Sequence, residues 1–309
     1  MIAFLAARLS SALVVVLGVA VLVFLLIHLV PGDPVAVMLG ESARPSDAEA
    51  LRRALGLDKP LLTQLLNYLQ SLLRLDLGQS LYSKRAISDI LAERLPPTVV
   101  LAVVALLVAV AIALPMGVLA AVRQNTLWDF GAMGVAMVGV SIPNFVMGPV
   151  LILLFSFTVG WFPVSGMEGP ASIVLPAVTL GTALAAILSR MVRAALLEVL
   201  NEDYIRTARA KGLSEFHVIT RHALRNATLP ILTLLGLQLG TLLGGAVITE
   251  MVFAWPGIGQ LTIEAIQRRD YPLLQASVLV ISVAYVAVNT LTDVLYAWLD
   301  PRIRIHGDS

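Results

Sequence analysis

If this chain hydrolysed ATP as a P-loop ATPase does, its sequence would contain a lysine directly after a glycine. A P-loop uses such a lysine to hold the phosphates of ATP. The sequence contains only three lysines, Lys59, Lys84 and Lys211, and each follows a residue other than glycine. The chain therefore cannot hydrolyse ATP by the P-loop mechanism.

The motifs of several other enzyme classes are also missing. The four histidines are His28, His217, His222 and His306, and no pair has the His-Glu-x-x-His spacing of a zinc protease. No Gly-x-Ser-x-Gly motif supplies a serine nucleophile. The absence of cysteine excludes disulfides, thiolate metal sites and cysteine nucleophiles. We therefore expect a protein that is not an enzyme and that holds no metal or cofactor of its own.

The composition indicates a protein that crosses a membrane several times. Of the 309 residues, 58% are hydrophobic and 13% are charged, and the mean hydropathy is +0.89. A soluble domain is typically about 45–50% apolar and about 25% charged. The formal net charge of +1 gives no reason to expect a nucleic-acid partner. The partner that the composition does imply is the lipid bilayer.

Six apolar segments have the length of a transmembrane helix, about 17–25 residues or more. They are Leu9–Val30, Val99–Val122, Phe130–Val159, Ser172–Ser189, Pro230–Glu250 and Ala276–Trp298. The third is longer than a single crossing needs. The first exceeds the apolar core of a signal peptide, roughly 7–15 residues, and lacks a small-residue cleavage site. We therefore expect an all-α membrane protein with six transmembrane helices, the first of which is retained.

Arginines set the orientation of these helices, because short cytoplasmic loops carry an excess of Lys and Arg. Arg123, the basic stretch from Arg190 to Arg225, and the C-terminal Arg302 and Arg304 all mark the cytoplasmic side. Residues 160–170 contain no Lys or Arg, as expected outside. Both termini are therefore expected in the cytoplasm.

Residues 31–97 form one long polar insert between the first two apolar segments. It contains several arginines, yet we place it outside, since long loops are largely exempt from the charge rule. Leucines between Leu65 and Leu73 recur at helical spacing. The insert is therefore expected to form short helices on the outer face of the membrane.

Ionisable groups within the apolar segments are few, which argues against an ion-coupled carrier. Such carriers usually keep charged residues at membrane depth, where these are costly. The candidates here are Asp293 and Glu250, both near the ends of their segments. The two halves also lack the matching broken segments of many secondary transporters. An ion-coupled secondary transporter remains the alternative from a different class of protein.

Neutral polar residues are the candidates for lining a transport pathway. Asn144 follows Pro143, so its amide either faces a cavity or pairs with the backbone carbonyl that the proline leaves free. Gln238, with Thr241 as its neighbour, projects away from Gly236 and toward either the pathway or a partner subunit.

Three glycines in the fifth apolar segment predict close helix packing. They recur every four residues, as Gly236, Gly240 and Gly244. Small residues at this spacing let a neighbouring helix approach closely in lipid.

The segment Asp203–Pro230 differs from the rest of the chain because it is basic and amphipathic. Tyr204 and Ala208 continue the apolar face of the preceding helix, and Glu202 and Arg206 have the spacing of a helix-surface ion pair. Gly212 is expected to end this helix, since glycine readily adopts the left-handed conformation of a helix C-terminus.

A second, short helix is expected to follow. Ser214 can cap it, and Phe216 and Ile219 fall on one of its sides. Pro230 is expected to open the next span. On these properties alone, the segment is either an ordinary interfacial loop or a surface that docks a partner.

This segment resembles part of a known family. The sequence ARAKGLS at 208–214, followed by RHALRNA at 221–227, resembles the cytoplasmic loop of the inner-membrane permeases of ABC importers. The resemblance is to the peptide/nickel branch, in its B-type subunit. Across such permeases the general pattern is Glu-Ala-Ala, three residues, Gly, and later Leu-Pro. Here Gly212 is in place, whereas Arg206-Thr207-Ala208 and Leu224-Arg225 stand at the other positions, as in the peptide branch.

Two further stretches extend the resemblance over almost the whole chain. LGLDKP at 55–60 and DLGQS at 76–80 resemble the outer insert of peptide-type B permeases. Residues 253–272 are similar to the family's outer loop before the last span, near the mouth of the pathway.

The resemblance implies a permease subunit of an ATP-driven ABC importer for di- or oligopeptides, with the type I ABC importer permease fold. Glutathione and nickel complexes are alternative cargoes within the family. The implied partners are a second homologous permease, two ABC ATPase subunits that bind ATP and Mg²⁺, and an extracytoplasmic substrate-binding protein. The implied location is a bacterial or archaeal plasma (inner) membrane.

The resemblance also implies a coupling loop, about residues 196–229, that docks on the ATPase. Its expected coupling residues are Ala208, Arg209, Lys211, Gly212, Leu213, Ser214, Glu215, Phe216 and Ile219. Phe216 and Ile219 would insert into a groove of the ATPase, with Arg209 and Lys211 at the rim. The chain would then divide into a first transmembrane helix (1–30), an outer helical insert (31–97) and a permease core with five helices (98–309).

Overall fold

The computed structural model of the chain describes residues 2–29 and 57–299, together with Val35, Ser46, Glu49 and Arg52 between them. Several residues used above, namely Leu55, Gly56, Arg302, Arg304 and His306, lie outside the described residues. Within the described part, extended pairing is limited to one isolated bridge between Gln79 and Ala86. The remainder is helices and their connections.

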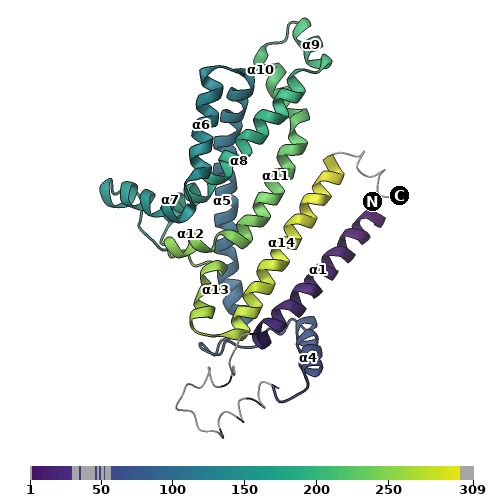
Figure 1. Cartoon of the computed structure of the whole chain (residues 1–309), viewed down its shortest axis with the longest axis vertical. Coiled ribbons are helices and arrows are strands. Elements are labelled where there is room, and N and C mark those ends of the chain that lie inside the picture. The colour runs from purple at the N-terminus through teal and green to yellow at the C-terminus, as the bar shows by residue number, and fades with distance from the viewer. Residues whose placement is uncertain are drawn as a thin grey trace.

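Figure 1 labels the helices along the chain. They are α1 (Ile2–Leu29), α4 (Leu61–Leu73), α5 (Ile87–Val122), α6 (Leu127–Ser141), α7 (Asn144–Leu151), α8 (Val174–Leu200), α9 (Asp203–Ala210), α10 (Glu215–His217), α11 (Leu224–Gly245), α12 (Val247–Val252), α13 (Ile258–Gln267) and α14 (Tyr271–Leu299). A 3₁₀ turn, Pro170–Ile173, precedes α8, and two π-helical segments, Ile152–Thr158 and Val218–Ala223, follow α7 and α10.

Five helices in the described chain are long and apolar enough to cross a membrane, or six if the bent pair of α6 and α7 counts as one span. This confirms the predicted all-α membrane fold with six spans. It also corrects the third span, which is not one straight helix over Phe130–Val159. α6 and the segment Asn144–Thr158 meet at an angle of 99°.

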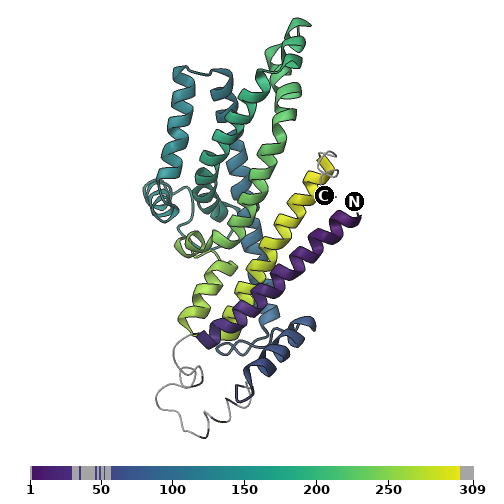
Figure 2. The ribbon, with the colours of Figure 1, turned by 45° about the vertical axis from the view of Figure 1, so that its right-hand side comes forward.

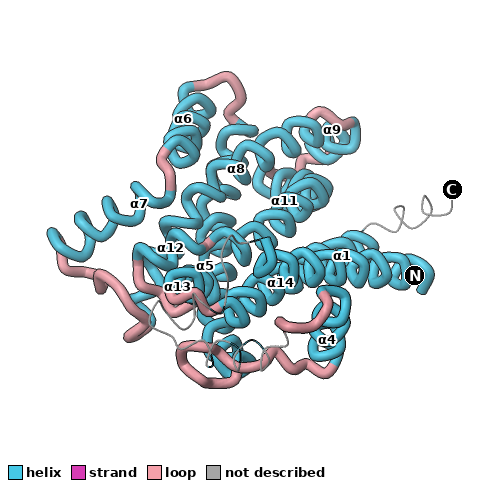
Figure 3. Tube along the Cα trace, turned by 60° about the horizontal axis from the view of Figure 1, so that its bottom comes forward, coloured by secondary structure: helices cyan, strands magenta, loops and turns pink. Residues whose placement is uncertain are grey.

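The corner between α6 and α7 lies at a proline. Ile142 has φ −91° and ψ 113°, the extended conformation that a following proline favours. Pro143 also lacks the N–H that would continue the helix. Its backbone instead begins α7, where its carbonyl accepts from the N–H groups of Val146 and Met147 at 2.9 and 3.0 Å. In Figure 3, α7 consequently extends sideways from the other helices.

α5 begins twelve residues before the predicted span, at Ile87 instead of Val99. The residues before Val99 are helical and partly buried, because Ile87, Ile90 and Leu91 pack against α13 and α14 in one apolar cluster. This burial keeps the helix continuous through Pro96 and Pro97, although interior prolines each cost about 3 kcal/mol.

The core lies between α5 and α8, which pack along most of their lengths. Small residues let the two backbones approach: Ala105, Ala109 and Ala113 on α5 are fully buried. A Cβ placed on Gly181 of α8 would lie 2.8 Å from the carbonyl oxygen of Ala105, so only glycine fits there. This close contact is the membrane packing that small residues permit.

α1 is peripheral and packs mainly along α14, as the views in Figures 1 and 2 both show. Arg8 of α1 pairs with Asp293 of α14 at 3.2 Å, and the Gln275 side chain donates to the carbonyl of Val23 at 3.0 Å. Asp293, one of the two ionisable residues found within the apolar segments, therefore forms an ion pair with Arg8.

The helices alternate in direction, so the connections gather at two ends of the molecule (Figure 1). One end carries α9, α10 and the loop between α5 and α6. The opposite end carries α4, α13 and the start of α5. The first turn of α1 and the last turn of α14 point toward the end that carries α9.

Candidate functional site

The segment between α8 and α11 protrudes at one end of the molecule (Figure 2). α8 ends at Leu200, and α9 begins after a short turn at Asn201 and Glu202. Ile205 and Ala208 of α9 are buried against the bundle, with exposed fractions of 0% and 6%. The predicted Glu202–Arg206 pair is replaced by an exposed pair between Arg206 and Asp203 at 3.3 Å.

Gly212 makes the corner between α9 and α10. Its φ is +79°, and no atom would obstruct a Cβ at this position. Position 212 therefore favours glycine because of its backbone conformation and not because of crowding. A left-handed backbone costs other residues roughly 1–2 kcal/mol.

Replacing Gly212 by alanine is expected to loosen this corner. Because about 1 kcal/mol corresponds to roughly fivefold in an opening equilibrium, trypsin should cut after Lys211 about five times faster in Gly212→Ala. Gly212→Asn is the matched control, since asparagine tolerates the left-handed region, and its cleavage rate should stay near that of the parent. Equal rates for all three proteins would show that the corner does not need glycine.

α10 presents one large apolar side chain to solvent. Phe216 is 72% exposed, and Leu213 beside it is 40% exposed. Ile219 was predicted to share this surface. It lies in the π-helical segment and is half-buried, and its neighbour Val218 is fully buried. The exposed apolar surface is thus formed by Leu213 and Phe216.

Polar contacts hold α9 and α10 together. Arg209 donates to both carboxylate oxygens of Glu215, at 2.7 and 3.2 Å, while Lys211 is exposed. Ser214 occupies the cap position with an extended backbone, but its hydroxyl contacts His217 Nδ1 at 3.1 Å instead of a backbone amide. The predicted rim residue Arg209 therefore also braces the corner.

The helix after Ser214 is continuous, which corrects the prediction that Pro230 opens the fifth span. α10, the π-helical segment and α11 form one continuous helix over Glu215–Leu243, of which the later part is apolar enough to cross a membrane. Pro230 lies inside α11. The side chains of Val218, Ala223 and Ala227 are buried against α8 and α9 in one cluster, and this packing carries the helix past the proline.

Two contacts near this segment could not be read from sequence spacing. Asn226 of α11 donates to the hydroxyl of Tyr204 at 2.7 Å, which joins α9 to α11. Arg193 of α8 donates to both oxygens of Asp129 on α6, at 2.7 and 2.8 Å. Asp129 is 3% exposed and also accepts from the Asn125 amide at 3.0 Å. The first contact ties the protruding segment to α11, and the second ties α6 to α8.

The predicted pathway residues differ in exposure. Asn144 is half-buried at the start of α7 and Thr241 is exposed. Gln238 is only 5% exposed, and its two amide atoms have no hydrogen-bond partner among the described residues. In this conformation Gln238 therefore does not line an open surface, because its face of α11 packs within the subunit.

Gly236 and Gly240 of α11 face α14. A Cβ on Gly236 would overlap the side chain of Thr292, and one on Gly240 would lie 3.0 Å from the ring of Tyr285. The surroundings of Gly244 lie outside the described side chains.

A buried carboxylate organises the loop at the opposite end. Glu250 of α12 is fully buried and accepts from the Thr98 hydroxyl at 2.7 Å and the Gln260 amide at 2.9 Å. Thr98 in turn accepts from the Ile258 amide at 2.8 Å. A Cβ on Gly257 would overlap the Glu250 carboxylate. The loop before α13 is thus built around this one side chain.

The same loop is fastened to α5 by a tryptophan. Trp255 is 1% exposed, and its indole N–H donates to the carbonyl of Pro97 at 2.9 Å. Together with Thr98, this bond holds the loop at the proline pair of α5. The outer loop expected at residues 253–272 did not include these contacts, since Pro97 and Thr98 lie more than 150 positions away along the chain.

Two family models match the chain. One, described as "Binding-protein-dependent transport system inner membrane component", covers residues 113–305. The other, the N-terminal part of such membrane components, covers residues 1–102.

Curated relatives are similar over nearly their full length. "Glutathione transport system permease protein GsiC" of Escherichia coli K12 is 43% identical over 286 residues, which are 93% of this chain and 94% of the relative. "Di/tripeptide transport system permease protein DppB" of Pseudomonas aeruginosa is 44% identical over 334 aligned residues, which are 98% of this chain and 99% of the relative.

Solved structures share the fold at low identity. The inward-facing MetNI methionine ABC transporter matches with a TM-score of 0.56 and 21% identity, over 68% of this chain and 96% of that one. An amino acid ABC transporter solved with histidines matches with a TM-score of 0.54 and 15% identity, over 68% and 94%.

Proposed function

The chain belongs to the family of inner membrane components of binding-protein-dependent transport systems, and from its similarity to peptide and glutathione permeases we infer that it carries small peptides. It is a permease subunit of an ABC importer and a multi-pass protein of the inner membrane. We propose its cargo, its orientation in the membrane and the composition of its complex from the observations that follow.

The observation that carries the peptide proposal is the similarity to the di/tripeptide permease, 44% identical over 98% of this chain. The glutathione permease is similar to nearly the same degree, and glutathione is itself a tripeptide. Both relatives therefore favour a cargo of two or three residues. Glutathione is the second candidate because of this relative.

We propose that the end carrying α9 and α10 is cytoplasmic and docks on an ATPase subunit. Its support is the exposed apolar surface of Leu213 and Phe216, at a corner fixed by Gly212. A few large side chains that become buried at the centre of an interface supply most of its binding energy, and the Phe216 ring is available for such a role. ATP and Mg²⁺ would then bind to two ATPase subunits, which work with a second permease and an extracytoplasmic binding protein.

Within this arrangement, residues 98–309 would form the permease core, 1–30 a first transmembrane helix and 31–97 an outer insert. Asn144 and Thr241 are proposed to line the pathway, since both have side chains that are not fully buried. Gln238 would join them only if α11 moved relative to its neighbours. Neutral amides and hydroxyls suit a route for varied peptides, because they can pair with backbone groups without fixing a charge.

The test is uptake by the whole complex reconstituted in liposomes with its ATPases and its binding protein. We expect ATP-dependent accumulation of labelled di- and tripeptides that unlabelled peptides suppress. Accumulation of a nickel complex or of glutathione alone would contradict the peptide proposal. Uptake driven by an ion gradient without ATP would contradict the proposed coupling.

A further inference from the structure

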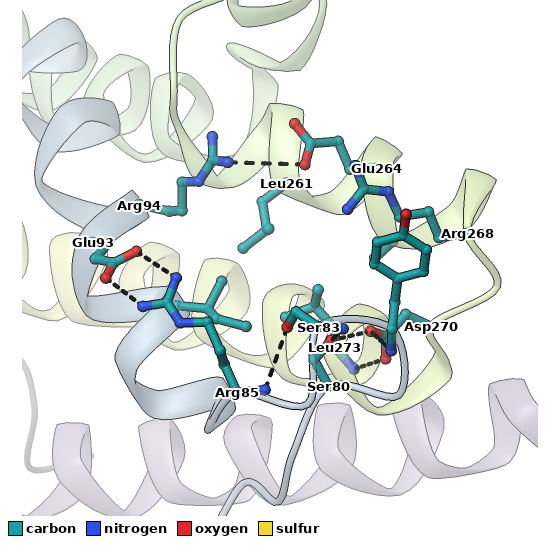
Figure 4. A pocket seen from close by; sticks show the side chains of 13 residues that line it. Ser80, Ser83, Arg85, Glu93, Arg94, Leu261, Glu264, Arg268, Asp270 and Leu273 are labelled. Carbon is teal, nitrogen blue, oxygen red and sulfur yellow. Dashed lines mark hydrogen bonds and ion pairs between the residues drawn. The ribbon is translucent and has the colours of Figure 1, made fainter.

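A polar pocket of about 170 Å³ lies at the end of the molecule opposite α9. Figure 4 shows that it forms between the last residues of the insert, the start of α5, and α13 with the turn that follows it. The first two segments adjoin each other, but α13 lies more than 160 positions further along the chain, so the fold brings it to them.

Asp270 fixes the shape of this pocket. It is 1% exposed and accepts from the Ser80 hydroxyl at 2.5 Å and from the Leu81 and Tyr82 amides at 3.2 and 3.3 Å. The insert is therefore tied to the turn before α14. Because its oxygens are already used, Asp270 contributes a rigid wall and not a free acceptor.

A second wall is electrically neutral. Arg85 donates to both carboxylate oxygens of Glu93, at 3.2 and 2.5 Å. This two-bond arrangement uses both carboxylate oxygens of Glu93 and directs Arg85 toward Glu93 instead of into the pocket.

Two other guanidinium groups in the pocket keep spare donors. Arg94 Nη2 lies 3.8 Å from Glu264, which is too long for a hydrogen bond. Arg268 lies over the ring of Tyr82, 4.4 Å from its centre, which uses its face and not its N–H groups. Among the described residues, neither guanidinium has a hydrogen-bond acceptor, and each has five N–H donors.

We propose that this pocket receives an acidic side chain of the extracytoplasmic binding protein, held by Arg94 and Arg268. This rests on the proposed function, which places this end of the molecule outside. A carboxylate matches the planar donors of arginine and would replace the loosely held Glu264. The pocket suits one side chain and not a whole cargo molecule, since small-molecule sites usually have about 300–1,000 Å³.

The experiment measures binding of the purified binding protein to the complete transporter in lipid nanodiscs, at several salt concentrations. Arg94→Gln and Arg268→Gln should each raise the Kd about tenfold or more and weaken its salt dependence. Arg269→Gln is the matched control, because this neighbouring arginine does not line the pocket. Its Kd should stay within about twofold of the parent.

Glu264→Gln keeps the test informative if an arginine variant folds poorly. Removing the carboxylate that competes for Arg94 should tighten binding, by roughly threefold or more. Unchanged affinity in all pocket variants would overturn the proposal, as would an equal loss in Arg269→Gln. An effect seen only with peptide-loaded binding protein would also overturn it, by assigning the carboxylate to the cargo.

Failure of this proposal can be told apart from failure of the proposed function. ATP-dependent peptide uptake by the parent protein tests the function alone. If that uptake is absent while the arginine variants still lower binding-protein affinity, the docking site stands and the cargo assignment falls.

Discussion

Phe216→Glu is expected to abolish ATP-driven uptake while leaving the membrane part of the protein folded. Phe216 is 72% exposed, so the substitution removes little packing within the chain. In the proposed complex, however, this ring is the main apolar anchor, and truncating such an anchor typically costs 2 kcal/mol or more. A buried glutamate adds desolvation, so docking should weaken by about 3 kcal/mol, roughly a hundredfold.

The measurement is the amount of ATPase that co-purifies with the tagged permease, together with peptide uptake. Thr207→Glu places the same charge at an exposed position of α9, nine residues before Phe216, and should retain both. Phe216→Met keeps an apolar side chain and should retain most of the binding. Normal co-purification and uptake in Phe216→Glu would show that α10 is not the docking element.

Gly257→Ala is expected to destabilise the loop before α13 by about 3 kcal/mol or more. The new methyl group would occupy the space of the Glu250 carboxylate. Displacing that carboxylate breaks its bonds to Thr98 and to the Gln260 amide, and hydrogen bonds to a charged group contribute about 1.5–3 kcal/mol each. A buried polar group left unpaired is among the most destabilising changes in proteins.

Thermal unfolding of the detergent-solubilised protein checks this prediction. Trp255 in the same loop is buried and supplies a fluorescence signal. Gly134→Ala is the control, because a Cβ there meets open space, and its melting temperature should not fall. Shortening the carboxylate with Glu250→Asp in the Gly257→Ala background should restore part of the loss. If Gly257→Ala melts like the parent, the loop is not built around Glu250.

The spans and the corner at Gly212 were predictable because each depends on a local property. Long apolar runs specify membrane helices, and Gly212 does adopt a positive φ. The break at Pro143 was accessible in principle, since the residue before a proline avoids the helical conformation. The early start of α5 was not, because its cause is the packing of Ile87 and Leu91 against α13 and α14.

The exposure of the side chains after Ser214 could not be predicted from spacing for a different reason. We assigned Phe216 and Ile219 to one face by assuming an ordinary helix, whereas residues 218–223 form a π-helical segment. One added residue in a turn rotates the following side chains by about 100°. Long-range pairs such as Asp129 with Arg193 leave no local pattern at all, since 64 positions separate them.

The continuity of the helix from Glu215 to Leu243 has a mechanical consequence. A run of 29 residues at 1.5 Å per residue is a rod of about 44 Å. The exposed ring of Phe216 sits near one tip of this rod, and the close contact of Gly236 with Thr292 lies far along it. A tilt of about 5° around that contact would swing the tip by roughly 3 Å, by the geometry of a 1.5 Å rise per residue. In the proposed complex, the helix would therefore act as a lever that pivots at Gly236, so that a small displacement of Phe216 tilts the membrane part of the helix.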